Sequence, residues 1–391
     1  MKGLAAATPG MRLAVAALLV GAAWLVDGWH RPAPLPSPEA QFVIGAQGVA
    51  ADTLKRQDGG NIPMPEQARA AHASNLLAMP AGHPAAVTAF WFAGDRESAP
   101  NVQIAAAQFD RTTQRWSPAR YVVERHAMAA QLGFGVRRLG NPVAWLDASG
   151  RMHLFVVATG WGGWAAARVL HLVQQGPDNR LDHMVFVPER VLPLSWLWNT
   201  SYLVRNNPQP LTDGGMQLPV HFELGIKYPV ALRFDAQGAF MGMERMSRRN
   251  YMLQAAFLAQ TPTDWIAVMR DQRSEGHVTA VQTNDGGSHW HDLPDLPLTN
   301  PDAAIAALAL TPGNSLLAHN TSPYSRERLD LSHAADGLHW SPLAALAHGG
   351  AGDEYSYPAM TWADGALWVS YTDHRRSIAW QRFVPQAKGA P

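Results

Sequence analysis

The chain has 391 residues, of which 47% are hydrophobic and 16% charged, so it can bury a large core and is not disordered as a whole. Its 31 basic and 31 acidic side chains balance, which argues against a nucleic-acid-binding protein. Because cysteine is absent, disulfides, zinc–thiolate sites, iron–sulfur clusters and a cysteine nucleophile are all excluded.

The first 30 residues have the pattern of an export signal. Lys2 and Arg12 precede an uncharged apolar run from Leu13 to Val26. This run is shorter than the roughly 20 residues that a membrane-spanning helix needs. We therefore predict a signal peptide over residues 1–30, with an uncleaved membrane anchor as the alternative. Either would place the protein in the periplasm, at the inner membrane facing the periplasm, or outside the cell.

Residues 31–65 begin with the proline-rich segment RPAPLPSP, and we expect them to form an extended linker outside the fold. The folded domain is predicted over residues 66–385, and residues 386–391 are left as a tail.

One unit recurs along the predicted domain: a turn containing glycine or aspartate, followed by an apolar strand. The six strands begin near residues 86, 152, 216, 265, 315 and 366. Their spacing of roughly 50 to 70 residues is the size of one four-stranded blade with its loops. The pattern predicts an all-β, six-bladed β-propeller, with a β-sandwich carrying long loops as the alternative. A closed ring also removes the exposed sheet edges that a large all-β chain must manage.

A turn motif supports the propeller. The segment TNDGGSHW fits the pattern Ser/Thr-x-Asp-x-Gly-x-x-Trp, with Thr283, Asp285, Gly287 and Trp290 at the defining positions. In such a turn the aspartate accepts backbone N–H groups, the glycine takes a positive φ and the tryptophan packs between blades. A second copy, HAADGLHW at 333–340, has alanine at the aspartate position. We expect both turns to be structural.

Residues 72–383 resemble the bacterial sialidase-like family, the BNR-repeat or Asp-box proteins related to exo-α-sialidases. Besides the Asp-box, the matching segments are HASN at 72–75, FWFAGDRES at 90–98, GNP at 140–142, SYLVRNNPQPL at 201–211, LPVHFE at 218–223, LTNPDAAIAAL at 298–308 and EYSYPAM at 354–360. The resemblance implies an exported glycosidase that acts on a glycan carrying sialic acid or a uronate, and we expect a monomer because a closed propeller needs no partner to fold. We expect no cofactor, because the sixteen histidines form no HExxH motif or comparable metal-binding pair.

The resemblance also implies a site at the centre of the ring. In the family, arginines clamp the substrate carboxylate, a carboxylic acid donates a proton, and a tyrosine paired with a glutamate is the nucleophile. Tyr357 corresponds to the nucleophile, and Asp95 and Glu97 are the candidate proton donors. The candidate substrate-binding residues are Arg270, Arg375, Arg205, Tyr355, Glu354 and Gln254.

Two departures from the family pattern bear on whether the protein is an enzyme or a binding protein without catalytic activity. The segment beginning at His72 replaces the first clamp arginine, and Gln254 occupies the neighbourhood of the glutamate that assists the tyrosine. A neutral amide cannot accept the tyrosine proton. The alternative function is therefore a non-catalytic propeller that binds a glycan or an envelope protein.

Overall fold

The computed structural model describes residues 8–30, 37–97, 99–195, 199–273 and 276–386, without the side chains of 23, 24 and 26–30. Two compact units divide at residue 36. The first contains helix α1 (Pro9–His30). Among the described residues, no helix is both long and apolar enough to cross a membrane. Part of the predicted signal (1–7), part of the linker (31–36) and most of the tail (387–391) lie outside the described residues.

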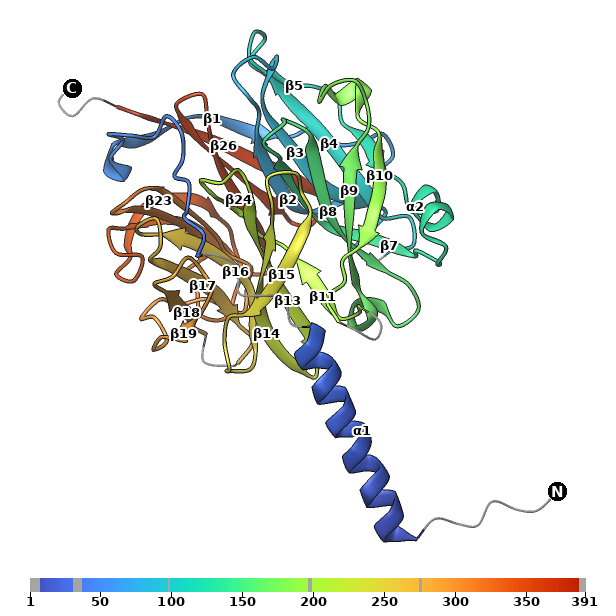
Figure 1. Cartoon of the computed structure of the whole chain (residues 1–391). Coiled ribbons are helices and arrows are strands. Elements are labelled where there is room, and N and C mark those ends of the chain that lie inside the picture. Colours follow the sequence, from blue (N-terminus) through green and yellow to red (C-terminus); the bar gives the residue numbers. More distant parts are fainter. Residues whose placement is uncertain (1–7, 31–36, 98, 196–198, 274–275, 387–391) are drawn as a thin grey trace. The chain divides into compact units, whose positions relative to one another are not determined.

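In the described part of the second unit, the strands form six antiparallel sheets, the blades of a propeller (Figure 1). Blade 1 contains β2 (Ala70–Ala78), β3 (Ala85–Gly94), β4 (Gln103–Asp110), β5 (Arg115–Trp116) and β6 (Arg120–Val123). Blade 2 contains β7 (Arg138–Leu146), β8 (Met152–Thr159), β9 (Arg168–Gln174) and β10 (Phe186–Val191). Blade 3 contains β11 (Tyr202–Val204), β12 (Gln209–Pro210), β13 (Met216–Leu224), β14 (Ile226–Phe234) and β15 (Phe240–Arg245).

Blade 4 contains β16 (Met252–Ala259), β17 (Trp265–Asp271), β18 (Val278–Thr283) and β19 (His291–Asp292). Blade 5 contains β20 (Ala306–Thr311), β21 (Asn314–Asn320), β22 (Arg328–Ala334) and β23 (Ser341–His348). Blade 6 contains β24 (Tyr355–Ala363), β25 (Ala366–Asp373), β26 (Ser377–Pro385) and, from the start of the domain, β1 (Leu54–Asn61). Helix α2 (Arg125–Leu132) and the 3₁₀ turns η1 (Ala51–Thr53), η2 (Gly163–Ala166) and η3 (Leu181–His183) lie in connections.

The ring closes through its inner strands, because β2 contacts both β7 and β24, and β16 and β20 continue the series of contacts between them. The six apolar strands predicted from the sequence are β3, β8, β13, β17, β21 and β25, the second strand of every blade. Residues of β3, β8 and β17 are buried along their whole length. Strands covered on both faces read as continuous apolar runs, which explains why these strands were visible in the sequence.

The predicted linker boundary at residue 65 is wrong. Strand β1 pairs with β26 along its length and completes blade 6, so the two ends of the domain join in one sheet. The segment before it also packs on the domain, since Ala40 forms a β-bridge with Leu211 and the Asn314 side chain donates a hydrogen bond to the Val49 carbonyl at 2.6 Å. The boundary was missed because β1 (LKRQDGGN) is polar: its exposed outer position needs few apolar side chains.

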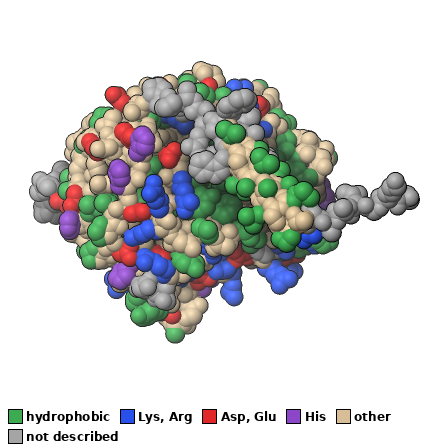
Figure 2. Space-filling model, turned by 60° about the horizontal axis from the view of Figure 1, so that its bottom comes forward, with side chains coloured by type: hydrophobic (Ala, Val, Ile, Leu, Met, Phe, Trp, Pro, Cys, Tyr) green, Lys and Arg blue, Asp and Glu red, His purple; other side chains and the backbone are tan. Residues whose placement is uncertain are grey.

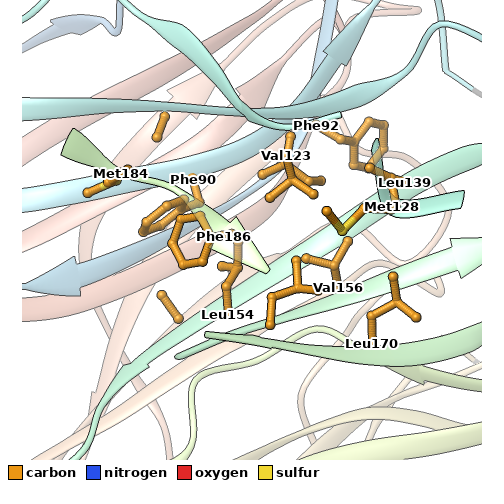
Figure 3. Packing of buried hydrophobic residues seen from close by; sticks show 14 of the residues in the cluster. Phe90, Phe92, Val123, Met128, Leu139, Leu154, Val156, Leu170, Met184 and Phe186 are labelled. Atoms are coloured by element: carbon orange, nitrogen blue, oxygen red, sulfur yellow. The ribbon is translucent and has the colours of Figure 1, made fainter. Parts of the chain in front are cut away.

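The core is divided among the interfaces between blades. One hydrophobic cluster joins blades 1 and 2, where Phe90, Phe92 and Val123 face Leu154, Val156 and Phe186 (Figure 3). Comparable clusters lie between blades 2 and 3, 3 and 4, 4 and 5, 5 and 6, and 6 and 1. Each blade is therefore held by burial against two neighbours, which fixes the positions of the loops and bulges around the ring axis.

The Asp-box turn has the predicted structure. It connects β18 to β19, the outer strands of blade 4. The Thr283 hydroxyl donates to Asp285 at 2.7 Å, and the His289 backbone N–H donates to the same carboxylate at 2.9 Å. Gly287 has φ 88°, and Trp290 stacks on Phe257 with ring centroids 5.7 Å apart.

In the degenerate copy, between β22 and β23, Asp336 replaces the missing aspartate. Its carboxylate accepts the backbone N–H groups of Leu338 and His339 at 2.9 and 2.8 Å. The turn therefore retains its hydrogen bonding with the acid one position later.

Candidate functional site

Backbone bulges mark the inner strands around the ring axis. In blades 1, 2, 4 and 6 the pairing register shifts next to a residue with positive φ: Ala73 (53°), Asn141 (44°), Gln254 (57°) and Tyr357 (53°). In blades 3 and 5, Ser201 (72°) and Asp302 (51°) lie shortly before the inner strand. A bulge re-aims a side chain out of the regular alternation of a strand, and three of these residues meet at one cluster.

Arg270, near the end of β17, joins three of these positive-φ residues, Gln254, Asp302 and Tyr357. Its Nε donates to the Asp302 carboxylate at 2.7 Å and its Nη1 donates to the Gln254 amide oxygen at 3.2 Å. Burial lowers the pKa of the Arg270 guanidinium, but the Tyr357 and Asp302 side chains outweigh it and raise that pKa above its ordinary value. Arg270 is therefore a firmly charged cation beside the tyrosine hydroxyl.

Tyr357 is half-buried at the centre of this arrangement. Its ring lies 4.2 Å from the His72 ring, centroid to centroid, and the Arg205 guanidinium lies 5.2 Å from its centroid. The predicted nucleophile and the predicted clamp residue Arg270 therefore come together, from blades 6 and 4.

A second cluster surrounds Glu354. Its carboxylate accepts hydrogen bonds from Arg375 Nε and Nη2 at 2.7 and 3.0 Å, from Arg326 Nη1 at 3.1 Å and from the Ser356 hydroxyl at 2.9 Å. Arg375 also pairs with Glu97. Glu354 thus organises two arginines, and Glu97 from the β3–β4 loop joins the same network. Arg326 links it to the first cluster, because its Nη2 donates to the Asp302 carbonyl at 2.9 Å.

Arg205 lies deeper than a substrate-binding residue would, with 1% of its surface exposed. It donates to the Ser74 carbonyl at 3.2 Å and to the Pro358 carbonyl at 2.8 Å, which ties blade 3 to blades 1 and 6. Burial lowers its pKa to about 10, so it is still charged at neutral pH. Its contacts are therefore structural, and we call Arg205 and the two asparagines that follow it the central brace.

Asn206 and Asn207 continue the brace. Asn206 donates to the Gln254 and Ala255 carbonyls at 2.8 and 3.0 Å, and Asn207 donates to the Met360 carbonyl at 3.0 Å. The segment RNN, quoted above as part of the family resemblance, therefore crosses the ring axis and connects four blades.

The remaining two candidates lie apart from Tyr357. Tyr355 packs edge-on against Tyr371 and His374, at 6.2 and 5.1 Å between ring centroids. Asp95 is exposed and lies near Tyr121 of β6, whose pKa is raised by burial and by the Asp95 charge. Among the described residues, no contact joins Asp95 to Tyr357 or Arg270.

The sequence reasoning missed three residues of the site: Arg326, Asp302 and the contact role of His72. Asp302 lies within the segment LTNPDAAIAAL, but no local pattern marks it as a partner of Arg270, because its positive φ and this contact arise only in the folded chain. Arg326 follows the second strand of blade 5 by a few residues. No local motif identifies it, because its partners Glu354 and Asp302 are distant in sequence.

Comparison with known proteins places this geometry in a family. The chain matches the BNR repeat-like domain over residues 86–369, well over half its length. The chain belongs to this family. Its fold is that of the sialidase-like propellers, as the Asp-box turns and the six blades indicate. No curated protein sequence matches it.

Among solved structures, a Hadza microbial sialidase, Hz136, aligns with TM-score 0.68 and 15% identity over 83% of this chain and 68% of its own. A protein of unknown function from Dyadobacter fermentans aligns with TM-score 0.65 and 11% identity over 85% of this chain and all of its own. Trypanosoma rangeli sialidase in complex with sialic acid aligns with TM-score 0.62 and 12% identity over 90% of this chain, which spans 60% of that enzyme. At these identities the likeness establishes the fold.

Proposed function

We propose that the protein is an exported sialidase-like glycoside hydrolase with a variant active site, acting on a glycan that carries sialic acid or a uronate. The observation that carries the proposal is the grouping of Tyr357 with two buried arginines: the Arg205 guanidinium lies 5.2 Å from its ring centroid, and the Tyr357 and Asp302 side chains raise the pKa of Arg270. A tyrosine hydroxyl beside a buried arginine is a nucleophile next to a cation that can hold the substrate carboxylate.

Arg326 is the second cation of the proposed carboxylate site, because it and Arg270 both bind Asp302. Arg326 shares the Glu354 carboxylate with Arg375, which also pairs with Glu97, so Arg375 is held by two carboxylates and Arg326 by one. Glu97 pairs with Arg375 and so joins the network around Glu354, which Asp95 does not, and it is the candidate proton donor once substrate displaces this ion pair. The pairing of arginines with carboxylates in the site resembles the molecular surface, since basic and acidic side chains are interspersed on the face that Figure 2 shows.

The proposal is tested with the full chain on fluorogenic α-sialosides and on β-glucuronides, comparing wild type with Tyr357→Phe. Loss of the nucleophilic hydroxyl should lower kcat by at least about a thousandfold. The exposed Tyr251→Phe is the matched control and should retain the wild-type rate. Turnover that survives in Tyr357→Phe would exclude the proposed chemistry.

The second candidate is a non-catalytic glycan-binding propeller, favoured by one observation. Gln254 places a neutral amide in the cluster where the family has a carboxylate, and Arg270 Nη1 donates to its amide oxygen at 3.2 Å. The substitution Gln254→Glu separates the two candidates, because it supplies a base within the same cluster. An enzyme limited by the missing base should gain at least about tenfold in kcat. A binding propeller should bind the sugar and show no turnover in either form.

A further inference from the structure

Trp161 presents a large aromatic ring to solvent. It lies in the connection between β8 and β9, the second and third strands of blade 2, and 84% of its surface is exposed. Among the tryptophans whose side chains the structure describes, it is the one exposed ring, and the others are buried or half-buried. A single exposed apolar side chain needs no explanation by itself, so the position and the neighbours of Trp161 decide what it can do.

Trp161 lies on the face of the propeller that carries the candidate site. Neighbouring strands of a blade are antiparallel, so the connection from the second strand to the third lies on the same face in every blade. This connection holds Glu97 in blade 1, Arg326 in blade 5 and Arg375 in blade 6. The exposed indole and the clusters at the ring axis therefore face the same side.

Blade 2 also lies next to the ring-axis site. Tyr357 and Phe134 pack against one hydrophobic cluster, between blades 1 and 2. The chain that follows Phe134 meets the start of the β8–β9 connection, where the Arg137 backbone N–H donates to the Thr159 carbonyl at 2.8 Å. The segments that carry Arg137 and Trp161 are therefore fixed against each other beside the site.

The arginines beside Trp161 lack acidic partners. The Arg137 guanidinium lies 4.5 Å from the centroid of the Trp161 ring, so it covers one face of the indole and leaves the other open. Neither Arg137 nor Arg138 pairs with a carboxylate among the described residues, and the buried Nε of Arg138 has no hydrogen-bond partner there. By contrast, the three arginines of the ring-axis clusters each bind a carboxylate.

An open indole face next to an unpaired guanidinium fits an acidic sugar. The C–H groups of a pyranose ring pack on the electron-rich face of an indole, and a guanidinium binds a carboxylate through two parallel N–H bonds. A neutral sugar would use the ring and leave the arginine without a partner. The charge of this surface therefore selects a sugar that carries a carboxylate.

We propose that Trp161 and Arg137 form a second subsite, which binds an acidic sugar adjacent to the one whose carboxylate Arg270 and Arg326 hold. The substrate is then an acidic oligosaccharide in which two neighbouring sugars carry carboxylates. The inference rests on the proposed function, since the site at the ring axis supplies the first subsite.

The test measures binding to the full-length protein by calorimetry, with two pairs of probes. Disialic acid is compared with sialyllactose, and digalacturonic acid with galacturonosyl-rhamnose, so each pair differs in whether the sugar next to the terminal acidic one is itself acidic. The wild type should bind the doubly acidic member of one pair at least about tenfold more tightly than its partner. The pair in which this occurs distinguishes a sialic acid substrate from a uronate.

Two variants locate the second subsite. Trp161→Ala should bind the doubly acidic probe about tenfold more weakly, because it removes the stacking surface. Arg137→Gln should bind it about fivefold more weakly, since an exposed ion pair contributes less, and should leave the singly acidic probe unchanged. Tyr324→Ala, which removes an aromatic ring that is 85% exposed on the same face in blade 5, and the exposed Arg115→Gln are the matched controls and should bind both probes like the wild type. All four side chains are exposed, so the variants should unfold at the wild-type urea concentration.

Equal affinity of the wild type for both members of a pair, or wild-type affinity in Trp161→Ala and Arg137→Gln, would overturn the second subsite and leave the proposed function in place. Weaker binding of the singly acidic probe by Arg137→Gln would assign this arginine to the first subsite and would also overturn the inference. A wild type that binds none of the probes would overturn the proposed function itself, and the inference with it.

Discussion

The brace at the ring axis gives a quantitative prediction for Arg205. Replacing it with methionine removes two charge-assisted hydrogen bonds, to the Ser74 and Pro358 carbonyls, each of which contributes about 1.5–3 kcal/mol. Part of this loss is offset because a desolvated charge is also removed. We expect Arg205→Met to lower the free energy of unfolding by about 3 kcal/mol. With an unfolding entropy of about 2.1 cal/mol/K per residue, a domain of roughly 350 residues should melt about 4 °C lower.

The assay is urea unfolding of the full chain, followed by tryptophan fluorescence, with the exposed Arg115→Met as control. Arg205→Lys should also destabilise, because an ammonium on a flexible stem does not reproduce the fork that reaches two carbonyls. A variant with wild-type stability and weakened sugar binding would refute the brace, and would return Arg205 to the role of a substrate-binding cation.

Three further predictions concern the frame of the propeller. Gly287→Ala should lower the free energy of unfolding by about 2–3 kcal/mol, because φ is 88° and the new Cβ would lie 2.5 Å from Gln217 Oε1. Gly313→Ala is the control: its φ is also positive, 72°, but the nearest atom would lie 3.8 Å from the new Cβ, so it should cost about 1 kcal/mol in the same urea assay. Trp290→Ala should cost about 2–3 kcal/mol, because the half-buried indole packs on Phe257 between blades 3 and 4, and a loss no greater than that of an exposed substitution would contradict this packing. Burial first, and then the charges of His153, Arg190 and Arg151, lower the pKa of His171 to about 3, so the unfolded chain binds a proton that the folded chain excludes. The free energy of unfolding should therefore fall as the pH drops from about 6.5 towards 3, by up to about 1.4 kcal/mol per pH unit from this residue. In urea titrations across this range, His171→Gln should lose stability less steeply with falling pH than the wild type.

The features that could be predicted from the sequence are those encoded by contiguous residues. The second strands of the blades are continuous apolar runs because neighbouring blades cover both their faces, and the Asp-box at 283–290 is a local turn whose hydrogen bonds lie within eight residues. Strand β1 was not predicted, because its partner, β26, lies at the other end of the chain.

The site depended on contacts that no local pattern encodes. Tyr357 and Arg270 were recognised from the family pattern, whereas Arg326 is defined by Glu354 and Asp302. Arg205 carries the same charge as Arg270, and only its burial against two carbonyls distinguishes a brace from a ligand-binding cation. Charge type can be read from the sequence, but burial and partners arise from the closure of the ring.

The bulges explain why the chemistry gathers at the axis. The positive-φ residues at the four register shifts, Ala73, Asn141, Gln254 and Tyr357, are not glycines, although glycine would relieve about 1 kcal/mol of backbone strain at each. Gln254 and Tyr357 instead present polar side chains there, and both interact with Arg270, as does Asp302 before the inner strand of blade 5. Strain of this kind persists where the surrounding packing holds it in place, and here the blade interfaces do so. Side chains held against such strain at one cation are positioned before any ligand arrives, which is the arrangement that a binding or catalytic site requires.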